Sequence, residues 1–332
     1  MNLPHLFHAA DAIAFVGATA AGKTASSLET ASLLASEGIS CEVISADSRQ
    51  CYRFLSIGTA KPSQAECASV PHHFIDCLNP DETCSAGEFG SRAASILADI
   101  RLRGKFPLIV GGSGLYLQAL CDGMFDESAH LPTENNDEYN RLQSQIRSRL
   151  QDDLETYGIA PLYDELCRYD PVSAEKYAER NPRRIIRALE HFLITGVPLS
   201  QAHQQTHQTR SFSTMFIGVA CERERLYKRI NTRTEAMFRT GIIEETEAVL
   251  QMGYAPTLNA LNTVGYKECI AYLRGEISRD RAQELTAQNT RRYAKRQGTW
   301  FRRDNRIHWL EAAPQELARE VVRKLRRAEE SR

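Results

Sequence analysis

The segment Gly17-Ala18-Thr19-Ala20-Ala21-Gly22-Lys23-Thr24 has a glycine, four residues and then Gly-Lys-Thr, which is the phosphate-loop pattern. It follows the apolar run Ala12 to Val16, which is typical of a short buried strand, and precedes Ala25 to Glu37, which favours a helix. In that setting, backbone N–H groups and the helix N-terminus face one anion, Lys23 adds a positive charge, and Thr24 adds a hydroxyl for Mg²⁺. The segment therefore predicts a di- or triphosphate site, with a chance glycine turn as the alternative.

The composition is that of an ordinary globular protein. Of the 332 residues, 42% are hydrophobic and 25% charged, and the formal net charge of -1 argues against a uniformly basic nucleic-acid binder. The nine cysteines include no Cys-x-x-Cys pair, so we expect reduced thiols and no zinc site. No apolar run approaches a membrane span and no basic region precedes the first hydrophobic stretch, so we expect a cytoplasmic protein without a membrane partner.

Further buried strands alternate with helices along the chain. They are predicted at Cys41 to Ala46, Phe106 to Val110 and Met215 to Ala220. Such alternation predicts an α/β fold in which a parallel-sheet core carrying the phosphate loop is flanked by helices. Residues 123–203 lack a strand signal and have amphipathic helical patterns instead, which indicates an inserted helical domain. The predicted organisation is a catalytic core of residues 1–122 and 204–310, the insertion 123–203, and a C-terminal helical tail 311–332.

Polar residues follow two of these strands. Asp47, Ser48, Arg49 and Gln50 come directly after the second strand, at the sheet edge where open parallel sheets bind ligands. The alternative is that Asp47 and Ser48 cap the next helix. The glycine cluster 111–114 follows the third strand, and it predicts either a close backbone approach to ligand, with Ser113 offering a hydroxyl, or a plain turn.

Two other polar positions are ambiguous in the sequence. Lys61, in the loop 58–62, fits a phosphate ligand and a solvated lysine equally well. The pair His72-His73 suggests a metal site, but adjacent residues on a strand point to opposite faces, which argues against a shared ion.

Arginines gather in three places. Arg229 and Arg233 are four apart on a predicted helix that follows a strand, so they suit a leaving diphosphate or ion pairs with Glu222 or Glu235. Within 180–187, four arginines fit either phosphodiester contacts or a solvated helix face. The segment 290–297 is basic and contains an aromatic residue, which is typical of contacts with structured RNA.

Together these segments resemble the bacterial tRNA dimethylallyltransferase (tRNA isopentenyltransferase) family from Ile13 to Leu310. The resemblance rests on their order along the chain. The matching segments are Gly17–Thr24, Ile44–Gln50, Ile57–Pro62, His72-His73, Val110–Tyr116, Arg184–Glu190, Val264–Lys267 and Ala294–Gln297.

This resemblance implies transfer of a dimethylallyl group from dimethylallyl diphosphate to the exocyclic amine of the adenosine 3′ of the anticodon. The phosphate loop, residues 17–24, then holds the prenyl diphosphate rather than ATP. Asp47 matches the general base, Thr24 the diphosphate and Mg²⁺ ligand, and Arg233, with Arg229 and Lys23, the groups at the departing diphosphate. The family also implies Mg²⁺ as cofactor and tRNA as partner, and we expect a monomer.

By the same matching, four segments and one serine fall where the family contacts tRNA. They are Asp47, Ser48, Arg49, Gln50, Ser113, Arg183, Arg184, Ile185, Ile186, Arg187, Asn262, Thr263, Val264, Gly265, Tyr266, Lys267, Thr290, Arg291, Arg292, Tyr293, Ala294, Lys295, Arg296 and Gln297. The sequence departs from the family pattern at Ala18, Ala21, Ser113 and Arg183 and around Gly265. No zinc-finger sequence follows residue 310, which implies a bacterial-type protein.

Two rival functions share parts of this pattern. A phosphate-loop small-molecule kinase would share the fold and an acid at Asp47, but it gives no reason for basic segments near both 184 and 295. An adenylate prenyltransferase acting on free nucleotide would share the donor site without needing the insertion 123–203.

Overall fold

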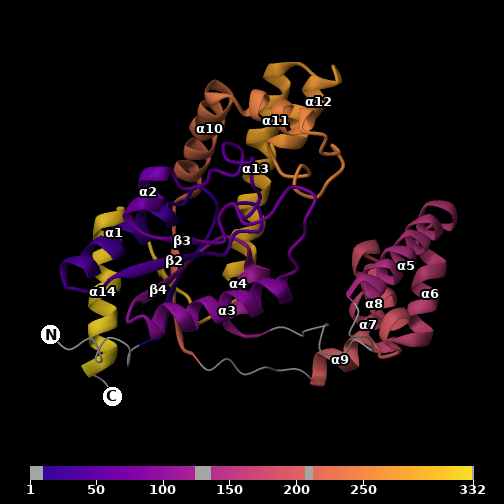
Figure 1. Cartoon of the computed structure of the whole chain (residues 1–332), viewed down its shortest axis with the longest axis horizontal. Helices are drawn as coiled ribbons and strands as arrows, with labels where there is room; N and C mark the ends of the chain where they lie inside the picture. Colours follow the sequence, from indigo (N-terminus) through magenta and orange to yellow (C-terminus); the bar gives the residue numbers. More distant parts are fainter. Residues whose placement is uncertain (1–9, 124–135, 206–211, 331–332) are drawn as a thin grey trace. The chain divides into compact units, whose positions relative to one another are not determined.

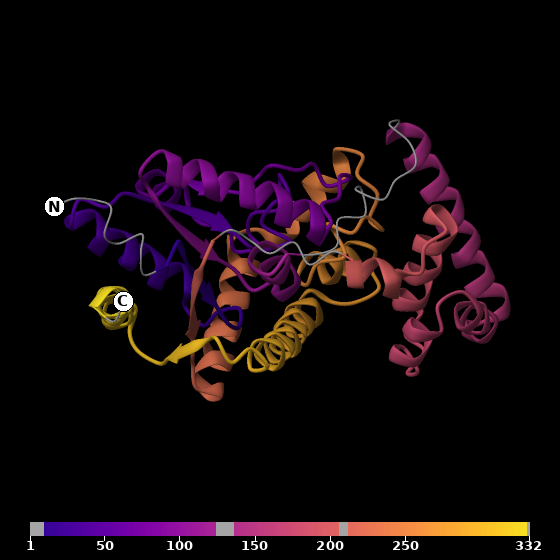
Figure 2. The same ribbon diagram turned by 90° about the horizontal axis from the view of Figure 1, so that it is seen from below.

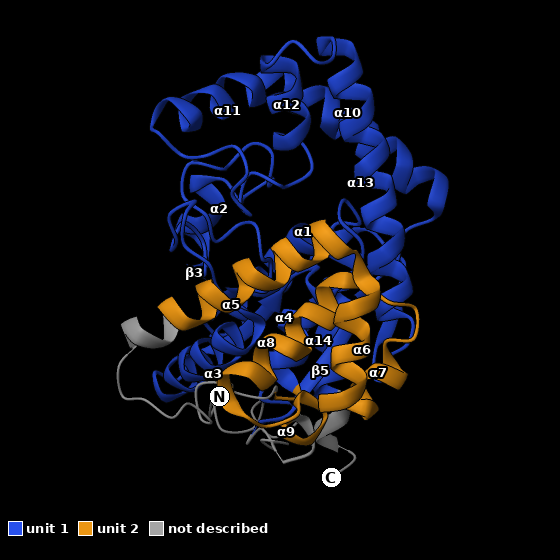
Figure 3. Cartoon of the chain, turned by 90° about the vertical axis from the view of Figure 1, so that its right-hand side faces the viewer, with its two compact units in different colours: residues 1–121, 210–332 blue, residues 122–209 orange. Residues whose placement is uncertain are grey.

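The computed structural model describes residues 10–123, 136–205 and 212–330 (Figure 1). The chain forms two compact units, of which unit 1 comprises Met1–Cys121 with Arg210–Arg332 and unit 2 comprises Asp122–Thr209 (Figure 3). Within the described ranges, no helix is both long and apolar enough to cross a membrane. All nine cysteines are free thiols.

Unit 1 is built on a six-stranded sheet in the order β3-β2-β4-β1-β5-β6, and every pairing in it is parallel. This confirms the predicted α/β class. The strands are β1 (Ala12–Val16), β2 (Cys41–Ser45), β3 (His72–His73), β4 (Phe106–Val110), β5 (Thr214–Val219) and β6 (His308–Leu310). The neighbours of β1 are β4 and β5, so the loop that follows β1 emerges at the centre of the carboxyl edge.

The helices of unit 1 connect and cover these strands. They are α1 (Lys23–Ser36), α2 (Gln64–Ser69), α3 (Ala86–Leu102), α4 (Gly114–Cys121), α10 (Arg223–Thr240), α11 (Ile242–Gln251), α12 (Tyr266–Leu273), α13 (Arg279–Phe301) and α14 (Pro314–Glu330). Both α2 and α3 begin with a capping box, in which Ser63 and Ser85 accept the N–H of the glutamate three residues on.

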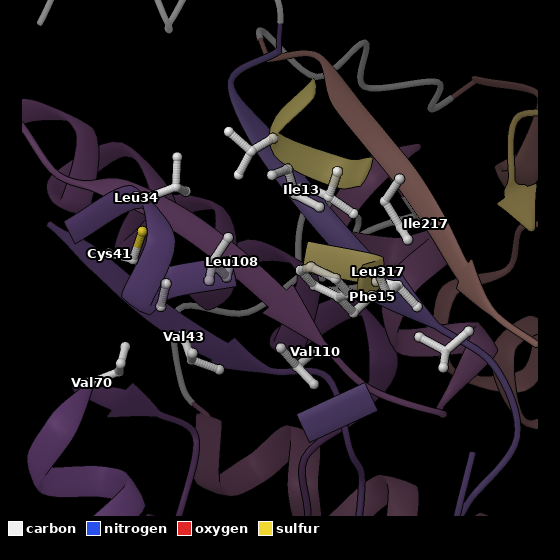
Figure 4. Close-up of a cluster of buried hydrophobic side chains, with 14 of the residues drawn as sticks. Ile13, Phe15, Leu34, Cys41, Val43, Val70, Leu108, Val110, Ile217 and Leu317 are labelled. Carbon is white, nitrogen blue, oxygen red and sulfur yellow. The ribbon is translucent and has the colours of Figure 1, made fainter. Parts of the chain in front are cut away.

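The period of two along β1 sends its side chains into two separate cores. Ile13 and Phe15 pack with α1 and α14 on one face (Figure 4). Ala14 and Val16 pack with α3 and α4 on the other. Figure 2 shows α3 and α14 on opposite sides of the strands. Fully buried β1 therefore holds the phosphate loop on a rigid support.

The C-terminal helix belongs to the catalytic unit. The sequence predicted a C-terminal helical tail at 311–332. The segment does form helix α14, and Leu317, Val321 and Leu325 of that helix are buried in the same cluster as Ile13 and Phe15. Strand β6, which the sequence did not predict, extends the sheet beside β5. Strand β6 and helix α14 up to Leu325 are therefore part of the fold that supports the sheet.

A second layer of helices lies beyond the carboxyl edge. Here α11, α12 and α13 bury Tyr266 and Ile270 against Tyr52 and Leu55 of the loop after β2. Tyr266 is fully buried, its hydroxyl donates to Glu245 at 2.6 Å, and it accepts the N–H of Gly58 at 3.0 Å. The same carboxylate accepts the N–H groups of Ser56 and Ile57. This buried network fixes the loop 56–60.

Unit 2 has its own core and, in its described part, only helices. They are α5 (Asn136–Tyr157), α6 (Ile159–Tyr169), α7 (Pro171–Lys176), α8 (Pro182–Thr195) and α9 (Leu199–Gln205). Leu150, Leu166, Ile185 and Leu189 are buried together. The amphipathic pattern of the sequence does not indicate the full length of α5, because several of its turns are polar and show no apolar period.

Candidate active site at the carboxyl edge of the sheet

The phosphate loop is held in a tight turn between β1 and α1. Gly17 and Gly22 have φ of 135° and 112°, which is backbone that side chains disfavour. A Cβ on Gly17 would lie 2.9 Å from the carbonyl oxygen of Val219, so β5 also requires a glycine there. Lys23 Nζ donates to the carbonyl oxygens of Gly17 at 3.1 Å and Ala18 at 2.8 Å. Thr24 is half-buried in the first turn of α1.

Both arginines of α10 contact this loop. Arg233 Nη2 donates to Thr19 Oγ1 at 2.8 Å, and Arg229 Nη1 donates to the carbonyl oxygen of Ala21 at 3.0 Å. The two arginines are therefore oriented by the loop, and not by ion pairs with Glu222 or Glu235. The structure brings the two arginines, Lys23 and the loop together, as their pattern predicted.

The positive charges of Lys23 and Arg233 are disfavoured by their surroundings. Burial lowers the pKa of Lys23 to about 8, with the charge of Arg233 lowering it further and that of Asp47 opposing. Burial also lowers the pKa of Arg233, again against Asp47. Two half-buried cations thus interact with one nearby carboxylate. A bound diphosphate would supply the negative charge that these groups lack.

Asp47 and Ser113 form the other side of the edge. Asp47 Oδ1 accepts the N–H of Arg49 at 2.9 Å, and Ser113 Oγ accepts the N–H of Ser48 at 3.0 Å and donates to Ser48 Oγ at 3.2 Å. Tyr293 of α13 joins them, since burial and the charge of Asp47 raise its pKa to about 12 while a hydrogen bond with Ser113 lowers it. The structure therefore gathers Asp47, Ser48, Ser113 and Tyr293 beside the cations.

Other members of the predicted segment 47–50 have internal partners. Arg49 Nη1 donates to the carbonyl oxygen of Asn259 at 2.7 Å. Gln50 accepts from Ser45 Oγ at 3.0 Å and donates to the carbonyl oxygen of Ala60 at 3.1 Å. Both side chains hold the loop after β2 in place. Asn259 was missed in the sequence, because nothing in its surroundings signals a partner 210 residues away.

Gln297 connects the loop to the glycine cluster. Its Oε1 accepts the N–H of Thr19 at 2.8 Å, and its Nε2 donates to the carbonyl oxygen of Gly112 at 2.9 Å. The side chain is 5% exposed. Protein groups therefore pack closely against the glycine cluster, and its approach to a ligand stays a prediction. A Cβ on Gly111 would lie 2.0 Å from the carbonyl oxygen of Ala46, and one on Gly114 would meet Trp300.

Lys61 and the histidine pair serve the fold. Lys61 Nζ is buried and contacts Asp76 Oδ1 at 2.5 Å, so it is neither a phosphate ligand nor a solvated lysine. His72 Nδ1 lies 2.7 Å from the carbonyl oxygen of Val70, and His73 Nε2 lies 2.7 Å from Glu42. In the described part of the chain, no group of three or more His, Cys, Asp or Glu could hold a metal ion.

The segment 262–267 is mostly inside the protein. Thr263, Gly265 and Tyr266 are buried, Val264 is half-buried, and Asn262 and Lys267 are exposed. Gly265 has φ of 103°, and its N–H donates to Glu268 at 2.7 Å. Only the exposed pair can offer side chains to a large partner in this conformation.

In unit 2, the arginines of 183–187 differ in their surroundings. Arg183 and Arg184 are exposed, and Arg184 pairs with Glu179 at 2.7 Å. Arg187 pairs with the buried Glu190 at 3.2 Å. Ile185 is fully buried and Ile186 half-buried, so they hold α8 in place rather than meet solvent.

Along α13, the residues 290–297 present two faces. Ala294 and Gln297 are buried, Thr290, Arg291 and Tyr293 are half-buried, and Arg292, Lys295 and Arg296 are exposed. Arg291 donates to Asn231 of α10 at 2.6 Å, which joins these two helices. The exposed three share one face of the helix and form its basic surface.

Comparison with known proteins places this site in a family. A family model described as IPP transferase matches residues 50–304. The chain belongs to the IPP transferase family. Among proteins of this family, the tRNA dimethylallyltransferase of Geobacter sulfurreducens is 41% identical over 292 residues, covering 87% of this chain and 90% of the relative. That of Desulforudis audaxviator is 40% identical over 314 residues, covering 93% and 96%.

Solved structures of IPP transferases have the same fold. The tRNA isopentenylpyrophosphate transferase of Bacillus halodurans has a TM-score of 0.64 and 34% identity, covering 96% of this chain and 97% of the other. A eukaryotic dimethylallyltransferase acting on tRNA has a TM-score of 0.75 and 26% identity, covering 96% of this chain and 77% of the other.

Proposed function

We propose that the chain is a tRNA dimethylallyltransferase, which moves a dimethylallyl group from dimethylallyl diphosphate to the exocyclic amine of the adenosine 3′ of the anticodon. The observation that carries the proposal is the carboxyl edge of the sheet, where the half-buried Lys23 and Arg233 lie close enough to Asp47 to feel its charge. An anion site and a carboxylate that can accept a proton are the two parts that this reaction needs. Relatives named for the reaction cover nearly the whole chain.

The donor diphosphate takes the place of the loop's internal hydrogen bonds. Lys23 Nζ turns from the carbonyl oxygens of Gly17 and Ala18 to the diphosphate, and Arg229 and Arg233 meet it from α10. These cations stabilise the negative charge that grows on the leaving group. Loop residues 17–24 surround it, and backbone N–H groups at the start of α1 add to the binding.

Mg²⁺ fits the residues present. It keeps several waters and binds through one or two protein oxygens together with substrate phosphates, so a single hydroxyl suffices and no cluster of carboxylates is needed. Thr24 supplies that hydroxyl in the first turn of α1. When bound, the ion would neutralise part of the diphosphate charge.

The acceptor base reaches Asp47 by leaving the anticodon-loop stack, at a cost of a few kcal/mol. The amine nitrogen forms a bond to the allylic carbon as the bond from that carbon to the diphosphate oxygen breaks. Asp47 accepts one proton from the amine, and the diphosphate departs. Ser48 and Ser113, joined by two hydrogen bonds, offer hydroxyl groups for orienting the base.

The tRNA backbone meets exposed basic side chains on each unit. On unit 1 these are Arg292, Lys295, Arg296 and Lys267, and on unit 2 they are Arg183 and Arg184. The helical insertion is thus the second tRNA-binding part. Local basic surfaces explain how a chain of net charge -1 can bind RNA.

The experiment is to digest tRNA from cells with and without the protein and to measure prenylated adenosine by mass spectrometry. We expect the modified nucleoside only when the protein is present. A protein that prenylates free adenylate but leaves tRNA unmodified would favour the adenylate prenyltransferase. Phosphorylation of a small molecule with no prenyl product would favour the kinase.

A further inference from the structure

Gln297 lies between the two halves of the proposed reaction site. On the donor side it accepts the N–H of Thr19, whose hydroxyl in turn accepts from Arg233. On the other side it donates to the carbonyl oxygen of Gly112. Because a backbone N–H only donates and a carbonyl only accepts, these partners fix the orientation of the Gln297 amide.

The Gly112 side leads to the general base. The next residue is Ser113. Its hydroxyl accepts the N–H of Ser48 and donates to the Ser48 hydroxyl, and Ser48 directly follows Asp47. The amide of Gln297 therefore adds a side-chain link between the phosphate loop and the segment that carries Asp47. It comes from α13, the helix whose other face carries the basic surface Arg292, Lys295 and Arg296.

The structure makes room for this link. A Cβ on Gly112 would lie 2.1 Å from Gln297 Nε2, whereas the nearest atom outside Gln297 is the carbonyl oxygen of Gly17 at 3.6 Å. Gly112 does not have a positive φ, so its backbone would accept an alanine. Gln297 alone explains why residue 112 is a glycine.

We infer that Gln297 is a positioning residue that sets the separation between the phosphate loop and Asp47, and so aligns the allylic carbon with the amine. This inference rests on the proposed function. It differs from the contact that the family resemblance implies, since the Gln297 amide is buried in this structure and both its oxygen and its nitrogen bond to groups of the protein.

The main test is Gln297→Met, which keeps the side-chain volume and removes both hydrogen bonds. We expect kcat for prenyl transfer to fall by about 100-fold, because a small misplacement of reacting groups costs that much, while the KM values for donor and tRNA stay nearly constant. The matched control is Gln288→Ala, an exposed glutamine of the same helix, which should leave kcat unchanged. Rates are normalised to the concentration of sites that bind dimethylallyl diphosphate, which removes any effect of unfolded protein.

A double-mutant cycle with Gly112 separates positioning from general damage. Gly112→Ala should lower kcat in the wild-type background, because the new methyl displaces the Gln297 amide. In the Gln297→Ala background the same change should have no further effect, since the methyl then meets only ordinary contacts. Because Gly112→Ala perturbs the link from the other side, the cycle remains informative if Gln297→Met folds poorly.

The outcomes are distinct. If Gln297→Met matches the Gln288→Ala control, or if the effects of Gly112→Ala and Gln297→Ala simply add, Gln297 does not position the site. If the wild-type protein itself makes no prenylated tRNA, the proposed function fails instead.

Discussion

The charged groups at the two ends of strand β2 are paired in different ways. At its start Glu42, 3% exposed, accepts hydrogen bonds from Arg103 at 2.9 Å and Lys105 at 2.7 Å and lies 2.7 Å from His73. Just beyond its end, Asp47 lies near Lys23 and Arg233, and it accepts a hydrogen bond from its own segment rather than from either cation. We call the Glu42 end closed, because its charge is paired by direct hydrogen bonds to cations. We call the Asp47 end open, because its carboxylate and cations are not joined by such bonds.

The pKa shifts record this difference. The hydrogen bond from Arg103, helped by Lys105 and His73, holds the pKa of Glu42 well below its usual range, so the folded state favours the charged carboxylate. At the other end, burial pushes the pKa of Lys23 and Arg233 downward, so the folded state disfavours their charges. In a structural cluster, charged groups of the protein compensate one another. In a binding site, the charge of the ligand compensates part of the charge of the protein.

Asp47→Asn should have the largest effect on the open end. We expect the rate of prenyl transfer to fall by about 100- to 10,000-fold, because the amide cannot accept the proton of the attacking amine. Binding of tRNA should stay nearly intact, since the base acts only during the reaction. Single-turnover rates and a tRNA binding isotherm measure the two effects. Near-normal turnover would remove Asp47 from the mechanism, and Asp81→Asn, on the surface, serves as the control.

Glu42→Gln tests the closed end. It should lower the free energy of unfolding by about 2–3 kcal/mol, at the lower end for a buried ion pair because Arg103 and Lys105 are each about a third exposed. Because the pKa of Glu42 is lowered on folding, its contribution is present above pH ~4 and is lost at lower pH. Urea unfolding at pH 7 and at pH 3 measures both. A variant that is as stable as wild type but inactive would show that this cluster belongs to the site.

Lys23 gives the open end a pH dependence. Its pKa of about 8 means that at pH 9 the unliganded protein must take up a proton to bind the diphosphate, so affinity for dimethylallyl diphosphate should be about tenfold weaker at pH 9 than at pH 7. Lys23→Arg, which stays protonated, should flatten this profile. Titration calorimetry at the two pH values measures it. Equal profiles for wild type and variant would exclude Lys23 as the cause.

The basic surface of α13 should produce the smallest change. Lys295→Ala and Arg296→Ala are each expected to reduce the slope of log affinity for tRNA against log salt by about one unit or less, without changing donor affinity. The matched control is Lys228→Ala, an exposed lysine on α10. If the slope is unchanged in both variants, this surface does not contact tRNA and is an ordinary solvated helix face.

Local pattern predicted the site's elements but not its links. The strands β1 and β4 and the loop 17–24 were predicted within a residue, since each has a strong period or motif. Strand β6 was missed because three residues, two of them exposed, show no pattern. The partner of Lys61 and the partners of Gln297 could not be predicted, since Gln297 bonds to residues 278 and 185 positions away. Contacts over such distances depend on the fold and leave no local signal.

The central claim is that the open end holds an allylic diphosphate for transfer to tRNA. A reconstituted reaction tests it directly. It contains the purified protein, an anticodon stem-loop, Mg²⁺ and either dimethylallyl diphosphate or ATP. The mass of the RNA is measured by mass spectrometry, and phosphate release is followed in parallel. We predict that the adenosine 3′ of the anticodon gains one dimethylallyl group when dimethylallyl diphosphate is supplied. With ATP we predict neither a change in RNA mass nor phosphate release. ATP hydrolysis stimulated by the RNA, with no mass gain from the prenyl donor, would contradict the account.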